Sequence, residues 1–149
     1  MTTSEDPVAT ECVFCQIVAG EGRAAVVYQD ELVMAFLVLQ PVTPGHLLVI
    51  PNQHYAFLGE VPADLAAHVF VVAQRLAGAL RSSGLPCEGV NLFLADGEAA
   101  FQEVFHVHLH VFARTVGDGF TIDSPAWQRP APAFDVLVAN AAVIERALE

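Results

Sequence analysis

The pattern of hydrophobic and polar positions predicts five strands and two helices. Short apolar runs bounded by turn residues predict four of the strands, at 24–29, 32–39, 46–51 and 90–94. The alternating run HVHLHVF at 106–112 predicts a fifth strand, because successive side chains of a strand point to opposite faces. Apolar residues recur at spacings of three and four over 61–83, which predicts a long helix. The alanine-rich segment 133–148 predicts a second helix near the C-terminus.

This order of elements indicates an α+β fold with an antiparallel sheet. Most of the predicted strands are joined by short loops, and one long helix separates the third strand from the fourth. Residues 1–11 are polar and acidic and are expected to be disordered. Residues 12–120 contain no internal repeat and no linker, so we expect one domain there, followed by a C-terminal extension over 121–149.

The composition narrows the choice of partners. Hydrophobic residues make up 54% of the chain and charged residues only 15%, which favours burial of apolar surface between subunits and predicts a homodimer. The net charge of −11 argues against binding of long nucleic acids, although a small phosphate ligand needs only a few local donors. We find neither a signal peptide nor an apolar run long enough for a membrane helix, and we expect a cytoplasmic protein that does not contact the membrane.

The histidines at 106–112 are the main candidate for chemistry. His106, His108 and His110 would share one face of the predicted strand, while Val107, Leu109 and Val111 cover the other face. Imidazoles titrate near neutral pH, so such a row can move protons, bind a metal or attack phosphorus. Two alternatives remain open: a chance row of hydrogen-bonded core histidines, and a catalytic zinc bound by all three imidazoles.

The cysteines Cys12 and Cys15 form a C-x-x-C pair. In a reducing compartment this pair indicates metal ligands or a redox dithiol rather than a structural disulfide. Two reduced cysteines packed near the surface are the alternative. A tetrahedral metal site would need two further ligands.

Four separated motifs resemble the bacterial branch of the histidine triad (HIT) superfamily in order and spacing. They are CVFCQIVAGE at 12–21, PVTPGHLLVIP at 41–51, GVNLFLADG at 89–97 and QEVFHVHLHVFAR at 102–114. The resemblance implies a five-stranded antiparallel sheet with a long helix, and a dimer formed through a continuous sheet. It also implies an enzyme that hydrolyses or transfers nucleoside monophosphate groups. Substrates in the family include dinucleoside polyphosphates, nucleoside phosphoramidates and aminoacyl adenylates.

The resemblance also assigns roles to residues. His108 would be the nucleophile that attacks the α-phosphorus, and His110 would hydrogen-bond the phosphate oxygens. Gln102 would contact the leaving-group bridge and the attacking water, and His46 would support the histidine row. Relatives with the N-terminal cysteine pair often bind a structural zinc, and the implied ligands here are Cys12, Cys15, His54 and His106.

Three positions depart from the family pattern. Val38 stands where an aspartate usually accepts hydrogen bonds from the ribose, and Ala95 stands where an asparagine usually helps to hold the α-phosphate. Phe101 replaces a glycine, so the loop before the histidines is expected to differ. Gln40 and Asp96 are the candidates for compensating substrate contacts. If nothing compensates, the alternative is a nucleotide-binding module with weak or no turnover.

Overall fold

The structure is a computed structural model that describes residues 11–148. The chain forms two compact units, the first ending at Asp118 and the second beginning at Gly119. The disorder expected for residues 1–11 concerns residues that, apart from residue 11, lie outside the described part.

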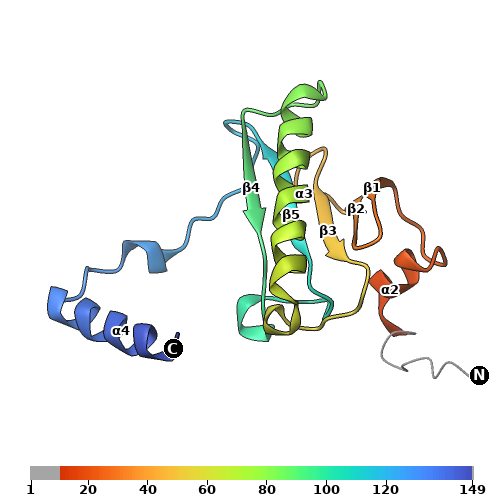
Figure 1. The fold of residues 1–149 in the computed structure, drawn as a ribbon. Helices are drawn as coiled ribbons and strands as arrows, with labels where there is room; N and C mark the ends of the chain where they lie inside the picture. The colour runs from red at the N-terminus through yellow and green to blue at the C-terminus, as the bar shows by residue number, and fades with distance from the viewer. Residues whose placement is uncertain (1–10, 149) are drawn as a thin grey trace, which may run out of the picture. The chain divides into compact units, whose positions relative to one another are not determined.

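The first unit is built on a five-stranded antiparallel sheet (Figure 1). The strand order is β1-β2-β3-β5-β4, and every neighbouring pair is antiparallel. The strands are β1 (Val26–Gln29), β2 (Val33–Leu37), β3 (Leu47–Pro51), β4 (Gly89–Phe93) and β5 (Leu109–Arg114). The structure therefore confirms the predicted α+β class and the antiparallel sheet.

Helix α3 (Ala63–Ser82) covers one face of this sheet (Figure 1). The buried side chains of this helix pack against the sheet in one core cluster. They include Leu65, Val69, Val72 and Leu80 of α3, together with Val49 and Val111 of the sheet. By length and composition alone α3 could cross a membrane. In the structure it packs one apolar stripe against the sheet, as the core helix of a globular domain does.

The opposite face of the sheet carries the short helix α2 (Val13–Val18). Phe14 of α2 is buried in a second cluster with the β2 and β3 side chains Met34, Phe36, Leu48 and Ile50. The Cys12 side chain accepts a hydrogen bond from the Cys15 backbone and so caps the helix. This helix was not predicted, because six residues are too few to show a helical period.

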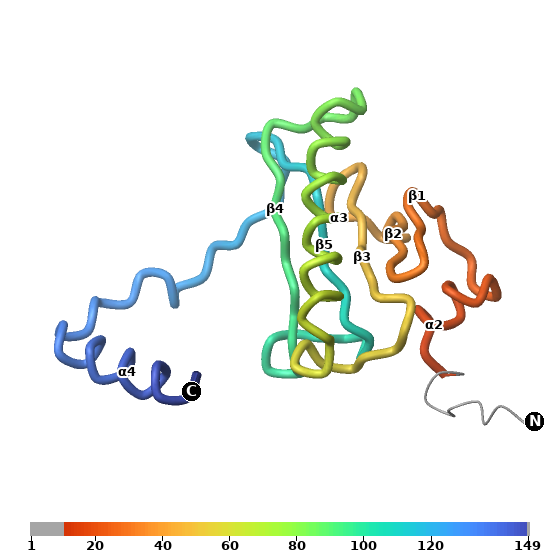
Figure 2. The backbone as a smooth tube through the Cα atoms, viewed as in Figure 1, coloured from red at the N-terminus to blue at the C-terminus, as the bar shows by residue number. Residues whose placement is uncertain are grey.

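The histidine segment differs from its predicted form in one respect. The prediction placed a single strand over 106–112, but β5 begins at Leu109, so His106 and His108 precede it. The backbone N–H of Val107 donates to the carbonyl of Tyr55 at 2.8 Å, which fixes this segment to the loop after β3 rather than to a neighbouring strand. The loop that connects β4 to β5 lies at the end of the sheet where α3 begins (Figure 2).

The second unit contains the 3-10 turn η3 (Pro125–Gln128) and helix α4 (Phe134–Ala147). The Ser124 hydroxyl accepts a hydrogen bond from the Ala126 N–H and caps η3. Helix α4 confirms the predicted C-terminal helix.

The turn between β1 and β2 is held by Asp30. Its carboxylate accepts hydrogen bonds from the backbone N–H groups of Leu32 and Val33, from the Tyr28 hydroxyl and from Nε2 of His68 on α3. Burial alone would raise the pKa of Asp30, but these hydrogen bonds outweigh it and lower the pKa below its usual value. Asp30 therefore ties the turn to α3 through its charged form.

Replacing Asp30 with asparagine is expected to lower the free energy of unfolding at pH 7 by about 1–2 kcal/mol, because charge-assisted hydrogen bonds are lost. Since the folded-state pKa is depressed, the contribution of Asp30 is present above the unfolded pKa and is lost as the pH falls. In urea unfolding, the difference in free energy of unfolding between wild type and variant should become smaller as the pH falls from about 5 to about 3. The exposed neighbour Glu31 supplies the control variant Glu31→Gln. A constant difference across this range would contradict the assignment.

Candidate active site and metal centre

His108 is oriented by the backbone of its own segment. Its Nδ1 lies 2.8 Å from the carbonyl oxygen of His106, and because a carbonyl only accepts, Nδ1 carries the proton. In the neutral ring, Nε2 then holds a lone pair. The residue is 7% exposed. Among described residues, the only buried side-chain nitrogen or oxygen without a partner is Oδ1 of Asn52, so the unpaired Nε2 of His108 reaches solvent.

A second chain of hydrogen bonds orients His46 and His110. The backbone N–H of Val42 donates to Nδ1 of His46 at 3.1 Å, so the proton of a neutral His46 is on Nε2. That Nε2–H lies 2.8 Å from Nδ1 of His110 and donates to it. The proton of His110 is therefore on Nε2, which is left as a donor. The ring centroids of His108 and His110 are 5.1 Å apart, so a lone pair and an N–H donor lie side by side.

Burial keeps these imidazoles neutral. Removal from water lowers the pKa values of His46 and His108 below the usual value. Burial, together with repulsion from His108 and His46, lowers the pKa of His110 to about 4. At neutral pH the two hydrogen-bond chains therefore keep the protonation pattern described above, with one nucleophilic nitrogen and one donor.

Phe14 forms an aromatic wall beside the histidines. Its ring meets His108 edge to face with centroids 5.2 Å apart, and it meets His106 and Phe36 in the same way at 5.8 and 5.6 Å. Nothing in the sequence pointed to this residue beyond its place between the two cysteines. Phe14 thus connects the cysteine pair to the candidate nucleophile.

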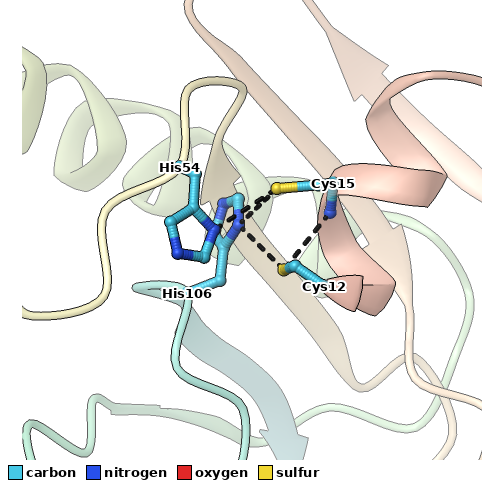
Figure 3. Close-up of side chains that lie close together, drawn as sticks. All are labelled: Cys12, Cys15, His54 and His106. Atoms are coloured by element: carbon cyan, nitrogen blue, oxygen red, sulfur yellow. Dashed lines mark hydrogen bonds between the residues drawn. The ribbon is translucent and has the colours of Figure 1, made fainter. Parts of the chain in front are cut away.

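The predicted metal ligands come together in space. Cys12, Cys15, His54 and His106 offer ligand atoms that all lie within 4.8 Å of one another (Figure 3). Nδ1 of His106 is 3.5 Å from both sulfur atoms, and Nδ1 of His54 is 3.3 Å from Sγ of Cys15. A tetrahedral zinc with bonds of about 2.0–2.3 Å places its ligands about 3.3–3.8 Å apart. The donor set and the spacing therefore fit zinc.

The surroundings of this cluster also suit a cation. Burial and the adjacent Cys12 raise the pKa of the Cys15 thiol to about 12, so the Cys15 thiol resists ionisation unless a positive charge is present. Nε2 of His106 lies 2.8 Å from the carbonyl oxygen of Pro51 and donates to it, which leaves Nδ1 of a neutral His106 as the ligand atom. Nδ1 is the atom that faces the sulfurs.

The sequence matches the HIT domain family over residues 19–117. The chain belongs to the HIT family. It is 43% identical to the protein hit of Bacillus subtilis over 113 residues, which cover 75% of this chain and 77% of the relative. It is 33% identical to the adenosine 5'-monophosphoramidase of Saccharomyces cerevisiae, over 77% of this chain and 70% of the relative. The family therefore includes a hydrolase that acts on a nucleotide.

A similar protein of known structure contains zinc. The crystal structure of a Zn-bound histidine triad family protein from Mycobacterium smegmatis superposes with a TM-score of 0.73. It shares 40% sequence identity, and the match covers 93% of this chain and 99% of that one. The HIT assignment is thus carried by both sequence and fold.

In this HIT domain, Gln102 is buried and makes three hydrogen bonds to backbone. Its Oε1 accepts from the N–H of Gly97 at 2.8 Å, and its Nε2 donates to the carbonyls of Ala56 and Val104 at 2.8 and 3.1 Å. These bonds use both amide hydrogens and fix the loop after β4. A contact between Gln102 and a leaving group remains a prediction. Donation from Nε2 would require one of its two bonds to open, whereas Oε1 keeps a second lone pair that can accept.

The two candidates for compensating contacts lie in different places. Oδ1 of Asp96 accepts a hydrogen bond from the N–H of Leu58 at 2.9 Å, so Asp96 helps to join the loop after β4 to the loop after β3. Gln40 is exposed and lines a cavity of about 450 Å³ together with Val38 and Phe14. Ala95 is buried and offers no polar side-chain atom. Substrate contacts by Gln40 and Asp96 stay predictions.

Phe101 keeps a backbone conformation that favours glycine. Its φ is +68° and its ψ is +28°, in the left-handed region, and it is the only non-glycine residue with positive φ among those described. The side chain is 83% exposed, so its packing offsets little of the backbone strain. The loop therefore retains a glycine-type conformation although its sequence has lost the glycine.

Replacing Phe101 with glycine is expected to raise the free energy of unfolding by about 0.5–1 kcal/mol, because the strain removed exceeds the added entropy of the unfolded chain. Phe101→Ala is the matched control, since it removes the ring and keeps Cβ, and it should give no such gain. Urea unfolding of the three proteins measures the difference. An equal gain in both variants would show that the exposed ring, not the backbone, is the source.

Proposed function

We propose that the chain cleaves a phosphoanhydride or phosphoramidate at the α-phosphorus of a nucleotide through a covalent nucleotidyl-His108 intermediate. The observation that carries this proposal is the hydrogen bond from Nδ1 of His108 to the carbonyl of His106. It leaves the Nε2 lone pair accessible, beside the N–H donor of His110. A nucleophile and a donor for phosphate oxygens are the two parts that nucleotidyl transfer needs.

The reaction has two steps. In the first, Nε2 of His108 bonds to the α-phosphorus, and the leaving group departs with the bonding electron pair and takes a proton from solvent. In the second, a water molecule bonds to phosphorus, Nε2 recovers its electron pair, and the water proton is released. An acceptor other than water would give transfer instead of hydrolysis.

The surrounding groups favour the transition state of the first step. As Nε2 bonds to phosphorus, the His108 ring gains positive charge, and the His106 carbonyl at Nδ1 stabilises that charge. The Nε2–H of His110 is placed to stabilise the negative oxygens, and His46 holds its ring in that orientation. These contacts supply local donors, so the net charge of −11 does not oppose a small phosphate ligand.

We also propose that Cys12, Cys15, His54 and His106 hold a structural zinc. Four protein ligands close the coordination shell, which is typical of structural rather than catalytic sites. Of the three histidines in the triad only His106 belongs to this cluster. That grouping favours the structural site over the alternative in which one catalytic zinc is bound by all three imidazoles. Zinc, when bound, would fix α2 to the segment that precedes β5.

The remaining assignments stay predictions. Strand β4 is at the edge of the described sheet and carries the exposed side chains of Leu92 and Phe93, so a homodimer through a continuous sheet would form there. A cytoplasmic location and the lack of nucleic-acid and membrane partners follow from composition alone.

The proposed function is tested with adenosine 5'-phosphoramidate and diadenosine tetraphosphate. The expected result is release of AMP from at least one of them by the purified, zinc-loaded protein. No release from either, together with measurable AMP binding, would favour the nucleotide-binding module instead. Neither release nor binding would contradict both functions.

A further inference from the structure

We propose that the cavity beside the histidines binds the base and sugar of the substrate by apolar contact without recognising the sugar hydroxyls, and that Val38 is the residue responsible. This rests on the proposed function, because it concerns the group attached to the phosphorus that His108 attacks. The cavity, called here the apolar pocket, has a volume of about 450 Å³. Small-molecule sites commonly have about 300–1,000 Å³.

Three residues that line the apolar pocket are also neighbours of the histidines in the candidate active site. Phe14 lines it and packs edge to face on His108, with ring centroids 5.2 Å apart. Leu48 lines it and is the register partner of His110, so the two side chains share one face of the sheet. Val38 lines it and donates its backbone N–H to the His46 carbonyl at 2.9 Å.

The first part of a nucleotide to enter the pocket is the sugar. In a nucleoside 5'-phosphate only one oxygen and one carbon separate the α-phosphorus from the sugar ring. With phosphorus at His108 and His110, the sugar lies where the pocket meets the histidines, and the base lies farther in. Val38 and Leu48 form the wall at that junction.

This wall offers little to bind a pair of sugar hydroxyls. Among the described residues that line the pocket there is no carboxylate and no hydroxyl side chain. The polar side chains there are Arg23 and Gln40, and both are exposed, where water competes for their hydrogen bonds. A carboxylate that accepts from both hydroxyls would favour a ribonucleotide at least about tenfold over its deoxy analogue. Val38 cannot make that contact.

The base, by contrast, meets surfaces that suit it. Phe14, Ile17 and Phe36 line the pocket with aromatic and aliphatic side chains, and a flat base gains from such burial whatever sugar it carries. Affinity would come from this burial and from the phosphate contacts, so removal of sugar hydroxyls should cost little.

The test compares the 5'-phosphoramidates of adenosine, 2'-deoxyadenosine and 2',3'-dideoxyadenosine on the zinc-loaded protein. We expect kcat/KM values that agree within about threefold. A preference of about tenfold or more for adenosine over the dideoxy substrate would overturn the proposal. If none of the three is turned over and diadenosine tetraphosphate also releases no AMP, the proposed function fails. This inference is then decided by calorimetric Kd values for the three matching monophosphates, compared by the same ratios.

Variants at the pocket separate the possible sources of sugar recognition. Val38→Asp should raise the ratio of adenosine to dideoxyadenosine turnover at least about tenfold, and Val38→Asn, of the same shape without charge, should raise it less. Gln40→Ala and Arg23→Met should leave this turnover ratio unchanged. A lower ratio in either variant would overturn the proposal. An unchanged ratio in Val38→Asp, with an unchanged Tm, would also overturn it. Val38→Thr, nearly isosteric with valine, replaces the aspartate variant if that protein does not fold.

Discussion

Replacing His108 with asparagine is expected to lower kcat for release of AMP by at least about 10³-fold, because removal of a covalent nucleophile leaves only binding and electrostatic contributions. Asparagine can still donate to the His106 carbonyl, so the segment should keep its conformation. Nucleotide Kd and Tm should therefore change little while turnover is lost. Steady-state kinetics, calorimetry and thermal unfolding of the same preparation measure the three quantities.

The matched control for this variant is His68→Gln. His68 lies on α3 and is bonded to Asp30 at 2.7 Å, on the face of the sheet opposite the candidate active site, and glutamine retains a donor for that contact. This variant should keep wild-type kcat and lose at most some stability. Equal losses of kcat in both variants would show that the effect is not specific to His108, and retention of kcat in His108→Asn would exclude the covalent route.

Replacing Cys12 with serine is expected to reduce bound zinc from about one atom per chain to well below half, since serine is a poor zinc ligand. If free zinc is about 1,000 times the Kd of the wild-type site, the lost binding corresponds to about 4 kcal/mol of folding stability. KM should rise more than kcat falls, because α2 carries Phe14 and Ile17 into the apolar pocket and would lose its anchor. Metal analysis, urea unfolding and kinetics check these effects.

The third cysteine supplies the control for the metal site. Cys87 packs against the core cluster under α3 and donates to the carbonyl of Gly89, away from the metal ligands. Cys87→Ser should keep its zinc, and a chelator should lower its Tm as it does in wild type. The same chelator should have little effect on Cys12→Ser. Zinc content in Cys12→Ser equal to that of wild type would contradict the ligand assignment.

Periodicity in the sequence was sufficient for the main elements of the fold. The period of three and four over 61–83 predicted α3, which spans Ala63–Ser82, and the apolar runs predicted the strands to within a few residues. Helix α2 was missed because its six residues are stabilised by the burial of Phe14 against β2 and β3, which are distant in sequence. Local propensity contains no information about that contact.

For the candidate site, the sequence predicted which residues come together but not their hydrogen bonds. The spacing of His106, His108 and His110 marked these residues as candidates for chemistry, and the resemblance to the HIT family named the four candidate metal ligands that the structure brings together. The protonation pattern could not be predicted, since it depends on where the carbonyls of His106 and Pro51 and the N–H of Val42 come to lie. The hydrogen bonds that fix Gln102 could not be predicted from the sequence either, because they join residues from two loops that only the fold brings together.

Covalent bonding of phosphorus to His108 is the central claim, and rapid-quench mass spectrometry measures it directly. The protein is mixed with adenosine 5'-phosphoramidate, quenched under alkaline conditions that preserve a phosphorus–nitrogen bond, digested and sequenced by fragmentation. The account predicts an adenylyl group on the peptide that contains residues 106–110, assigned to His108 and missing in His108→Asn. AMP release by wild type with no such adduct at any quench time, or with the adduct on another residue, would contradict it.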